Sequence, residues 1–222
     1  MKLKVDIKKT FPNNRKFSLE VSFENSDGCF GILGASGSGK TVILKCISGI
    51  VSPEAGFISL NDRVLFDSKS KINLKPQERR VGYLFQNYAL FPKLTAKKNI
   101  SIALSSANKF SNCEIEKKVD FWIKSLGLSG MENLLPKELS GGQQQRIALA
   151  RMLVVEPDAI LLDEPFSALD WPLRCQMQTL LKSTLQETNA ASIMVTHNKD
   201  EALNICQNIA LIDNGKIISK IT

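Results

Sequence analysis

The sequence lacks the marks of several protein classes. It has no run of about 18 apolar residues that could cross a bilayer, and its N-terminus alternates lysines with apolar residues instead of carrying the apolar core of a signal peptide. Its five cysteines are scattered, odd in number and never spaced C-x-x-C, which argues against a disulfide framework or a zinc site. At 222 residues and 43% hydrophobic composition, the chain can still bury a full core. We therefore expect a folded protein of a reducing compartment.

Negative charge is in deficit, because 29 Lys and Arg face 22 Asp and Glu and leave a net charge of +7. Such an excess suits nucleic acid, an anionic nucleotide or a membrane surface. The basic clusters, for example Lys69–Lys71 and Lys97–Lys98, are short and have no interleaved aromatic residues on which bases could stack. We interpret them as solvated faces and expect no nucleic-acid partner.

The most specific stretch fits the phosphate-binding pattern G-x-x-x-x-G-K-[ST]. Its glycines let successive backbone N–H groups turn inward around phosphate oxygens. Its lysine adds a charge for the β- and γ-phosphates, and its threonine hydroxyl is placed for Mg²⁺. A predicted strand, Cys29–Leu33, precedes it, and a predicted helix from Thr41 to Ser48 follows and points its N-terminus at the phosphates. The predicted nucleotide-binding residues of this loop are Gly34, Ala35, Ser36, Gly37, Ser38, Gly39, Lys40 and Thr41.

Polar residues follow three predicted strands. Asp163 and Glu164 end the apolar run Ala159–Leu162, His197 follows Ser192–Thr196, and Gln86 ends Val81–Phe85. If the strand before Asp163 neighbours the strand before the loop, the acidic pair lies beside the phosphates. Asp163, Thr41 and Gln86 are then the predicted Mg²⁺ ligands, and Glu164 orients the attacking water. Taken alone, Asp-Glu-Pro is a common sequence at the turn that ends a strand. A lone histidine such as His197 is more often a surface residue.

A second helix opens with Ser140 and two glycines, after Leu139. The N-terminus of such a helix is another anion site by the same physics. One chain with one nucleotide has no use for two such sites, so we predict that this turn serves the nucleotide of a neighbouring chain. Ser140 as a plain helix N-cap is the alternative and is compatible with that role.

The rest of the chain predicts an α/β fold. Residues 2–8 and 17–23 are expected to form an antiparallel β subdomain, residues 56–67 a hairpin turning at Asn61 and Asp62, and residues 209–221 a closing hairpin. From 87 to 157 the period is helical. We predict a P-loop NTPase (RecA-like) domain over 1–222, with a mostly parallel sheet core from 1–86 and 158–222 and an inserted helical subdomain at 87–157.

Together the motifs resemble the nucleotide-binding subunit of an ATP-binding cassette (ABC) transporter, in the order of that family. Besides the loop, they are Gln86 as Q-loop, Leu139–Gln143 as signature, Ile160–Glu164 as Walker B, Ser167–Asp170 as D-loop and His197 as switch histidine. The resemblance implies ATP and Mg²⁺ as cofactors and catalytic roles for Glu164, His197 and Gln86. It also implies a homodimer that closes head to tail, in which Ser140, Gly142 and Gln143 reach the partner's γ-phosphate and Asp170 couples the two sites.

Within the family, the stretch Arg79–Pro92 is most similar to importer subunits for oxyanions, above all molybdate, with sulfate close behind. The resemblance then implies transmembrane permease subunits as partners, a substrate-binding protein as an indirect partner, and a peripheral location on the cytoplasmic face of the cell membrane. Phe11 is the best-placed aromatic for stacking on adenine, whereas Phe17 is expected in the core. The chain stops where the cassette is complete, so no C-terminal regulatory domain is expected.

Two other functions remain open from the sequence. One is an ABC importer ATPase for sulfate or another small solute, and the other is a soluble ABC ATPase without a transport role. A non-catalytic regulatory module is disfavoured because Glu164 and His197 are both intact.

Overall fold

The computed structural model describes residues 2–11, 17–105 and 110–221. It divides into two compact units. The first unit comprises Met1–Tyr83, Asp158–Glu164 and Leu181–Thr222, and the second comprises Leu84–Pro157 and Pro165–Leu180. The second unit thus includes a stretch after the acidic pair, besides the helical stretch expected at 87–157.

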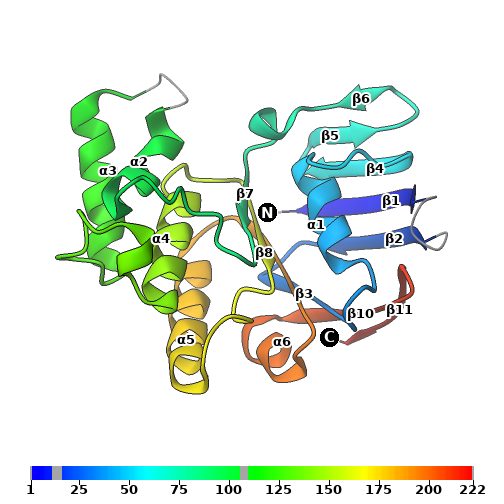
Figure 1. Cartoon of the computed structure of the whole chain (residues 1–222). Helices are drawn as coiled ribbons and strands as arrows, with labels where there is room; N and C mark the ends of the chain where they lie inside the picture. The colour runs from blue at the N-terminus through cyan, green and yellow to red at the C-terminus, as the bar shows by residue number, and fades with distance from the viewer. Residues whose placement is uncertain (1, 12–16, 106–109, 222) are drawn as a thin grey trace. The chain divides into compact units, whose positions relative to one another are not determined.

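The N-terminal part of the first unit is antiparallel (Figure 1). β1 (Leu3–Phe11) pairs with β2 (Phe17–Asn25) on one side and with β4 (Ala55–Leu60) on the other, and β5 (Arg63–Asp67) and β6 (Ile72–Asn73) continue outward. Val5 lies opposite both Phe23 and Ile58, and all three are buried. The period-2 alternation places such residues on one face and charged residues on the other. The predicted hairpin turn is present, with Asn61 at φ 54°.

The other strands of the first unit include the predicted parallel core. β10 (Asn208–Asp213), β3 (Cys29–Leu33), β9 (Ala191–Thr196) and β8 (Ala159–Asp163) follow one another as parallel neighbours, and β7 (Val81–Leu84) lies at the edge next to β8. β11 (Lys216–Ile221) closes a hairpin with β10 and joins β2 through one pairing, Lys216 with Glu20, so the eleven strands of the described residues form one sheet. β8 and β9 are buried throughout, as strands covered on both faces require.

The strand order decides a point that the sequence left as a condition. β9 lies between β3 and β8, so the strand that ends in Asp163 is not the neighbour of the strand before the phosphate-binding loop. Neighbour relations depend on how the chain crosses over the sheet, and the apolar pattern of a single strand does not record them.

Helices pack on this sheet. α1 (Lys40–Ser48) contacts β8 and β9, α6 (Lys199–Ile205) contacts β3 and β9, and a short 3-10 turn, η1, spans Pro76–Glu78. α1 ends at Gly49 with φ 82°, as the sequence predicts. Arg79, which is fully buried, donates to the carbonyl oxygens of Cys46 and Ile47, both at 2.8 Å. Since the last carbonyls of a helix lack helical partners, Arg79 completes the C-terminal end of α1.

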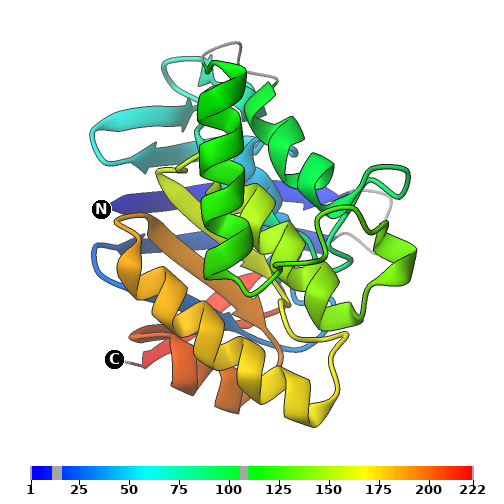
Figure 2. The same cartoon turned by 90° about the vertical axis from the view of Figure 1, so that its left-hand side faces the viewer.

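The second unit is helical (Figure 2). α2 (Ala96–Ser105), α3 (Asn112–Ser125) and α4 (Gly141–Leu153) pack together, and η2 (Pro136–Glu138) precedes α4. α5 (Trp171–Glu187) begins in this unit and ends in the first. Of the apolar residues that predicted α3, Val119 and Leu126 are buried, but Phe121 is 60% exposed. Among the described residues, no helix is long and apolar enough to cross a bilayer.

Candidate functional site

The phosphate-binding pattern forms a loop between β3 and α1. Gly37 and Gly39 have φ of 81° and 104°, in the left-handed region that favours glycine. A Cβ on Gly39 would lie 2.8 Å from Cζ of Phe17, so this glycine also permits a close approach of the β2 side chain. The middle of the loop, Ala35 to Gly37, is exposed. The loop therefore has the backbone that its glycines predict, and its tip is open.

Lys40 is a buried cation at the start of α1. Its Nζ donates to the carbonyl oxygens of Gly34 and Ala35, both at 2.8 Å, and lies 3.8 Å from Oε1 of Glu164. Burial lowers the pKa of Lys40, and the negative charges of Glu164 and Asp163 act in the opposite direction. The nearby Ser38 Oγ is buried and has no hydrogen-bond partner among the described residues. An ammonium group and a spare hydroxyl in one loop fit phosphate oxygens as ligands.

Asp163 accepts two hydroxyl hydrogen bonds and is 4% exposed. Thr41 Oγ1 donates to its Oδ1 at 2.9 Å, and Tyr83 OH donates to its Oδ2 at 2.9 Å. Although β9 separates β3 from β8, the first turn of α1 thus brings Thr41 to the end of β8. Burial, and next the charge of Asp163, raise the pKa of the Tyr83 phenol well above its usual value, so it remains a donor at neutral pH.

Sequence reasoning did not single out Tyr83. In the alternation of Val81–Leu84 it is only one aromatic strand residue, and its hydroxyl gains a partner only once β7 is known to lie beside β8. No signal in the sequence marks this contact, because Tyr83 and Asp163 are 80 residues apart in the chain.

Glu164 and His197 lie together at the carboxyl ends of β8 and β9. His197 Nδ1 is 3.1 Å from Glu164 Oε2, and the His197 side chain is 58% exposed whereas that of Glu164 is 17% exposed. Glu164 has φ 45°, which is uncommon for a residue with a Cβ, and its N–H donates to the carbonyl oxygen of Val195 at 3.0 Å. Thr196 Oγ1 donates to the buried Glu201 carboxylate at 2.6 Å and so fixes the turn that carries His197.

Five further predicted residues belong to the second unit, namely Gln86, Ser140, Gly142, Gln143 and Asp170. Ser140 caps α4, since its Oγ accepts from Gln143 N at 3.3 Å while Ser140 N donates to Gln143 Oε1 at 2.8 Å. Gly142 is buried, and a Cβ there would lie 2.7 Å from Cδ1 of Leu173. Asp170 Oδ1 accepts from Leu173 N at 3.1 Å. Ser140, Gly142, Gln143 and Asp170 are therefore grouped around the starts of α4 and α5, and Gln86 is exposed.

Exposed aromatic surface follows Asp170 directly. Trp171 is 74% exposed, the largest exposed fraction among the large apolar side chains that the structure describes as exposed. Trp122, the other tryptophan, is half-buried and packs edge to face against Phe121, with 5.3 Å between the ring centroids.

Phe11, predicted to stack on adenine, is half-buried at the end of β1. Its ring centroid is 6.3 Å from that of Phe17, and Lys9 Nζ lies 5.7 Å from it. Phe17 is partly buried and packs against the core, as expected.

The residues present also fit a magnesium ion that arrives with a nucleotide. Among the described residues, no group of three or more His, Cys, Asp and Glu side chains could hold a metal by itself. Mg²⁺ needs no such group, because one or two protein oxygens together with phosphates and water complete its shell. Asp163 and Thr41 offer such oxygens.

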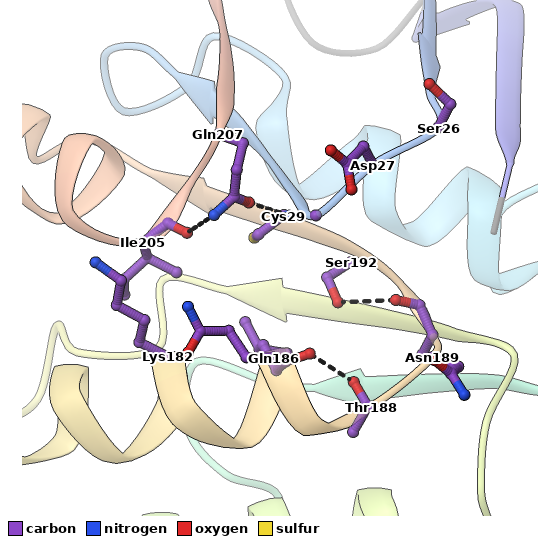
Figure 3. Close-up of a pocket in the computed structure, with 13 residues that line it drawn as sticks. Ser26, Asp27, Cys29, Lys182, Gln186, Thr188, Asn189, Ser192, Ile205 and Gln207 are labelled. Carbon is purple, nitrogen blue, oxygen red and sulfur yellow. Dashed lines mark hydrogen bonds between the residues drawn. The ribbon is translucent and has the colours of Figure 1, made fainter.

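A cavity of about 580 Å³ lies elsewhere in the first unit, at the amino ends of β3 and β9 (Figure 3). Its polar lining includes Asp27, Lys182, Gln186 and Gln207, and it contains none of the predicted site residues. The loop and the acidic pair occupy the carboxyl ends of the strands, where parallel sheets bind their ligands.

A glycine-rich loop with a buried lysine, a threonine hydroxyl on an aspartate and an adjacent glutamate define the class of P-loop nucleotide-binding proteins. Residues 19–167 match the family model described as ABC transporter. This match covers more than half of the chain, and the chain therefore belongs to the ABC transporter family.

Two curated relatives illustrate the match. The sulfate/thiosulfate import ATP-binding protein CysA of Caulobacter vibrioides is 41% identical over 202 residues, which cover 89% of this chain and 58% of that protein. The Fe(3+) ions import ATP-binding protein FbpC of Haemophilus influenzae is 40% identical over 209 residues, which cover 94% of this chain and 59% of that protein. The chain thus spans less than two thirds of the length of these relatives.

A solved structure confirms the predicted fold class. The dimeric ATP-binding cassette MJ0796, in a post-hydrolysis state bound to ADP and Pi, has a TM-score of 0.82 and 28% identity and covers 100% of this chain and 98% of its own. The fold is that of an ABC ATPase cassette, an α/β P-loop NTPase.

Proposed function

We propose that this chain is the ATP-binding and ATP-hydrolysing subunit of an ABC importer. One observation carries the proposal. Within the first unit, Thr41 contacts Asp163 at 2.9 Å, while Lys40 and His197 lie 3.8 Å and 3.1 Å from the two carboxylate oxygens of Glu164. Groups suited to bind phosphate, to bind metal and to activate water therefore lie together at the carboxyl ends of the parallel strands.

The loop binds the triphosphate. Lys40 exchanges its bonds to the Gly34 and Ala35 carbonyls for phosphate oxygens, and the unpartnered Ser38 hydroxyl donates to another. Phe11 stacks on the adenine. Thr41 and Asp163, with Gln86, hold Mg²⁺, which when bound supplies positive charge against the charge that develops on the phosphates.

Glu164 orients and polarises the water that attacks the γ-phosphate. His197 contacts the γ-phosphate and, from its position beside Glu164 Oε2, holds that carboxylate in place. Little covalent chemistry is asked of the protein, because positioning and charge stabilisation account for most of phosphoryl-transfer catalysis.

A second copy completes the site. Ser140, Gly142 and Gln143 lie at the start of α4, where Ser140 is exposed, and in a head-to-tail homodimer they bind the partner's γ-phosphate while Asp170 couples the two sites. ATP drives the cycle because it binds the closed dimer more tightly than the open one. The dimer acts on transmembrane permease subunits at the cytoplasmic face of the membrane, with a substrate-binding protein as an indirect partner.

The proposed cargo is an oxyanion, with molybdate first and sulfate second. This assignment rests on the likeness of Arg79–Pro92 to oxyanion-importer subunits, since a cassette does not touch the transported solute. Of the two relatives, one is named for sulfate and thiosulfate and the other for Fe(3+).

The test is phosphate release from ATP by the purified chain, with Lys40→Ala as the matched variant. Wild-type protein should hydrolyse ATP only with Mg²⁺, and Lys40→Ala should lose nucleotide binding. Retained affinity in Lys40→Ala would mean that the loop does not bind phosphate. Co-purification from membranes, followed by uptake assays with molybdate and sulfate, tests the permease and the cargo.

A further inference from the structure

Both oxygens of the Asp163 carboxylate are engaged by hydroxyl groups from different elements. Oδ1 accepts from Thr41 in the first turn of α1, and Oδ2 accepts from Tyr83 on β7, each at 2.9 Å. Asp163 is itself buried. A carboxylate held at two points cannot rotate about its terminal torsion without breaking a charge-assisted hydrogen bond, and such bonds are stronger than neutral ones.

Tyr83 is well placed for a fixed contact. It lies on β7, the strand next to β8, and is half-buried. Tyr83, Thr41 and Asp163 all belong to the first unit. The contact therefore joins three elements of one compact body, with Asp163 at its centre.

We propose that Tyr83 is a positioning residue for the magnesium site: its hydroxyl ties down Oδ2 of Asp163 and so leaves Oδ1 oriented toward Thr41 and the metal. This inference rests on the proposed function, because the metal arrives with the nucleotide. Groups that orient a metal-binding side chain through a hydrogen bond typically contribute about tenfold or more to metal affinity.

The chain supplies a matched control, because it contains only two tyrosines. Tyr88, in the second unit, is buried, and its hydroxyl has no hydrogen-bond partner among the described residues. Tyr83→Phe and Tyr88→Phe therefore remove the same atom, the first from a half-buried ring and the second from a buried ring. Only the first removal frees an oxygen of Asp163.

The experiment measures the dissociation constant of a nonhydrolysable ATP analogue by calorimetry, with Mg²⁺ and with EDTA. Its readout is the ratio of the two constants, which is the gain in affinity due to the metal. In Tyr83→Phe we expect this gain to fall by about tenfold while the affinity in EDTA stays within about twofold of wild type. In Tyr88→Phe both quantities should match wild type. A purely structural role of Tyr83 would lower the melting temperature and leave the ratio unchanged.

An unchanged ratio in Tyr83→Phe, or an equal fall in both variants, would overturn the inference while leaving the proposed function intact. No nucleotide binding by the wild type in either condition would instead overturn the proposed function and this inference with it. Should Tyr83→Phe fail to fold, the inference is tested instead by fluorine NMR on wild-type protein labelled with 3-fluorotyrosine. Its two fluorine resonances are assigned with Tyr88→Phe. The Tyr83 resonance should shift when Mg²⁺ is added to the nucleotide complex, and an unmoved resonance contradicts the inference.

Discussion

Arg79 shows how one side chain can support the site from a distance. Its guanidinium donates to the carbonyl oxygens of Cys46, Ile47 and Leu74 and to Asn73 Oδ1, all within 2.9 Å, and it has no carboxylate partner among the described residues. Burial lowers its pKa, so the surrounding oxygens must offset the lost hydration. α1 therefore has the phosphate-binding loop at its first turn and Arg79 at its last.

Arg79→Lys should reduce the free energy of unfolding by about 2–4 kcal/mol, because an ammonium group cannot reproduce the planar fork that reaches four oxygens. Urea titration followed by circular dichroism measures this change. Arg80→Lys is the control. Arg80 is 59% exposed and forms an ion pair with Asp158 at 3.0 Å, so its replacement should cost less than about 1 kcal/mol. Equal losses would contradict the role assigned to Arg79.

The five cysteines should separate into two classes of reactivity. Cys113 and Cys175 are exposed, whereas Cys29, Cys46 and Cys206 are buried. Burial raises the pKa of Cys46 to about 11, and the Cys206 hydrogen bond followed by burial raises that of Cys29, so both thiols stay protonated at neutral pH. We expect two thiols to react rapidly with a disulfide reagent in native protein and all five in denaturant. Three or more rapid thiols would contradict the described core.

At this scale the sequence was a good guide to the polar residues of the first unit. Lys40, Thr41 and Asp163 could be predicted because a motif or the end of an apolar strand marks each of them. Tyr83 could not be predicted, because its partner becomes apparent only when strands far apart in the chain become neighbours. The chemical roles of all these residues remain predictions for the experiments above.

At the scale of elements, the segment that follows Gln86 is bound by side chains of two helices. Arg151, in the last turn of α4, donates to the carbonyl oxygens of Tyr88 and Ala89 at 2.7 and 2.8 Å, and both residues have positive φ. Asn99 on α2 is fully buried and exchanges hydrogen bonds with both backbone groups of Phe91. Two helices of the second unit thus hold this segment, in which Tyr88 and Ala89 adopt a backbone conformation that is uncommon for residues with a Cβ.

Arg151→Met should loosen this segment without disturbing the sheet. We expect faster amide hydrogen exchange over residues 88–94 and a loss of about 1–3 kcal/mol in unfolding free energy, because two charge-assisted hydrogen bonds to the carbonyl groups of Tyr88 and Ala89 are lost. Hydrogen exchange with mass spectrometry gives both the location and the size of the effect. Lys97→Met, which removes an exposed ion pair with Asp120 at 3.2 Å, is the control and should change neither. Unchanged protection of residues 88–94 in Arg151→Met would show that the conformation of this segment does not depend on the Arg151 hydrogen bonds.

The positions of helices and strands could largely be predicted from the hydrophobic period and from the Gly and Pro residues that end them. The compact unit to which a segment belongs could not be predicted in this way. Pro165–Leu180 joins the helical unit because Leu173 packs on Gly142 and Met177 Sδ accepts from Arg146, contacts between residues about thirty apart in the chain. The apolar period of α3 likewise included Phe121, which is exposed, because a period identifies a face and not what covers it.

For the whole molecule, the strand order is the part that sequence reasoning left open. The fold class and the family could be predicted because the motifs occur in the family's order along the chain. The family model and the solved cassette structure confirm both predictions. Which strands are neighbours depends on crossovers, and the insertion of β9 between β3 and β8 leaves no trace in either apolar run.

The assembly prediction concerns two copies of the chain. Glu164→Gln removes the charge that we propose activates water but leaves the binding groups, so with Mg²⁺ and ATP it should accumulate as a stable dimer. Size exclusion with light scattering measures the mass. The double variant Glu164→Gln with Lys40→Ala should remain monomeric, because it cannot bind the nucleotide that joins the copies. A monomer of Glu164→Gln at saturating nucleotide would contradict the shared site.

The exposure of Trp171 makes such experiments possible without any label. An indole in water emits at longer wavelength than one in an apolar surrounding, and Trp122 is already half-buried. If another molecule covers the start of α5, the emission of Trp171 moves toward the blue, and if nothing covers it, the spectrum stays as it is. The protein thus carries a built-in optical reporter for what happens beside Asp170.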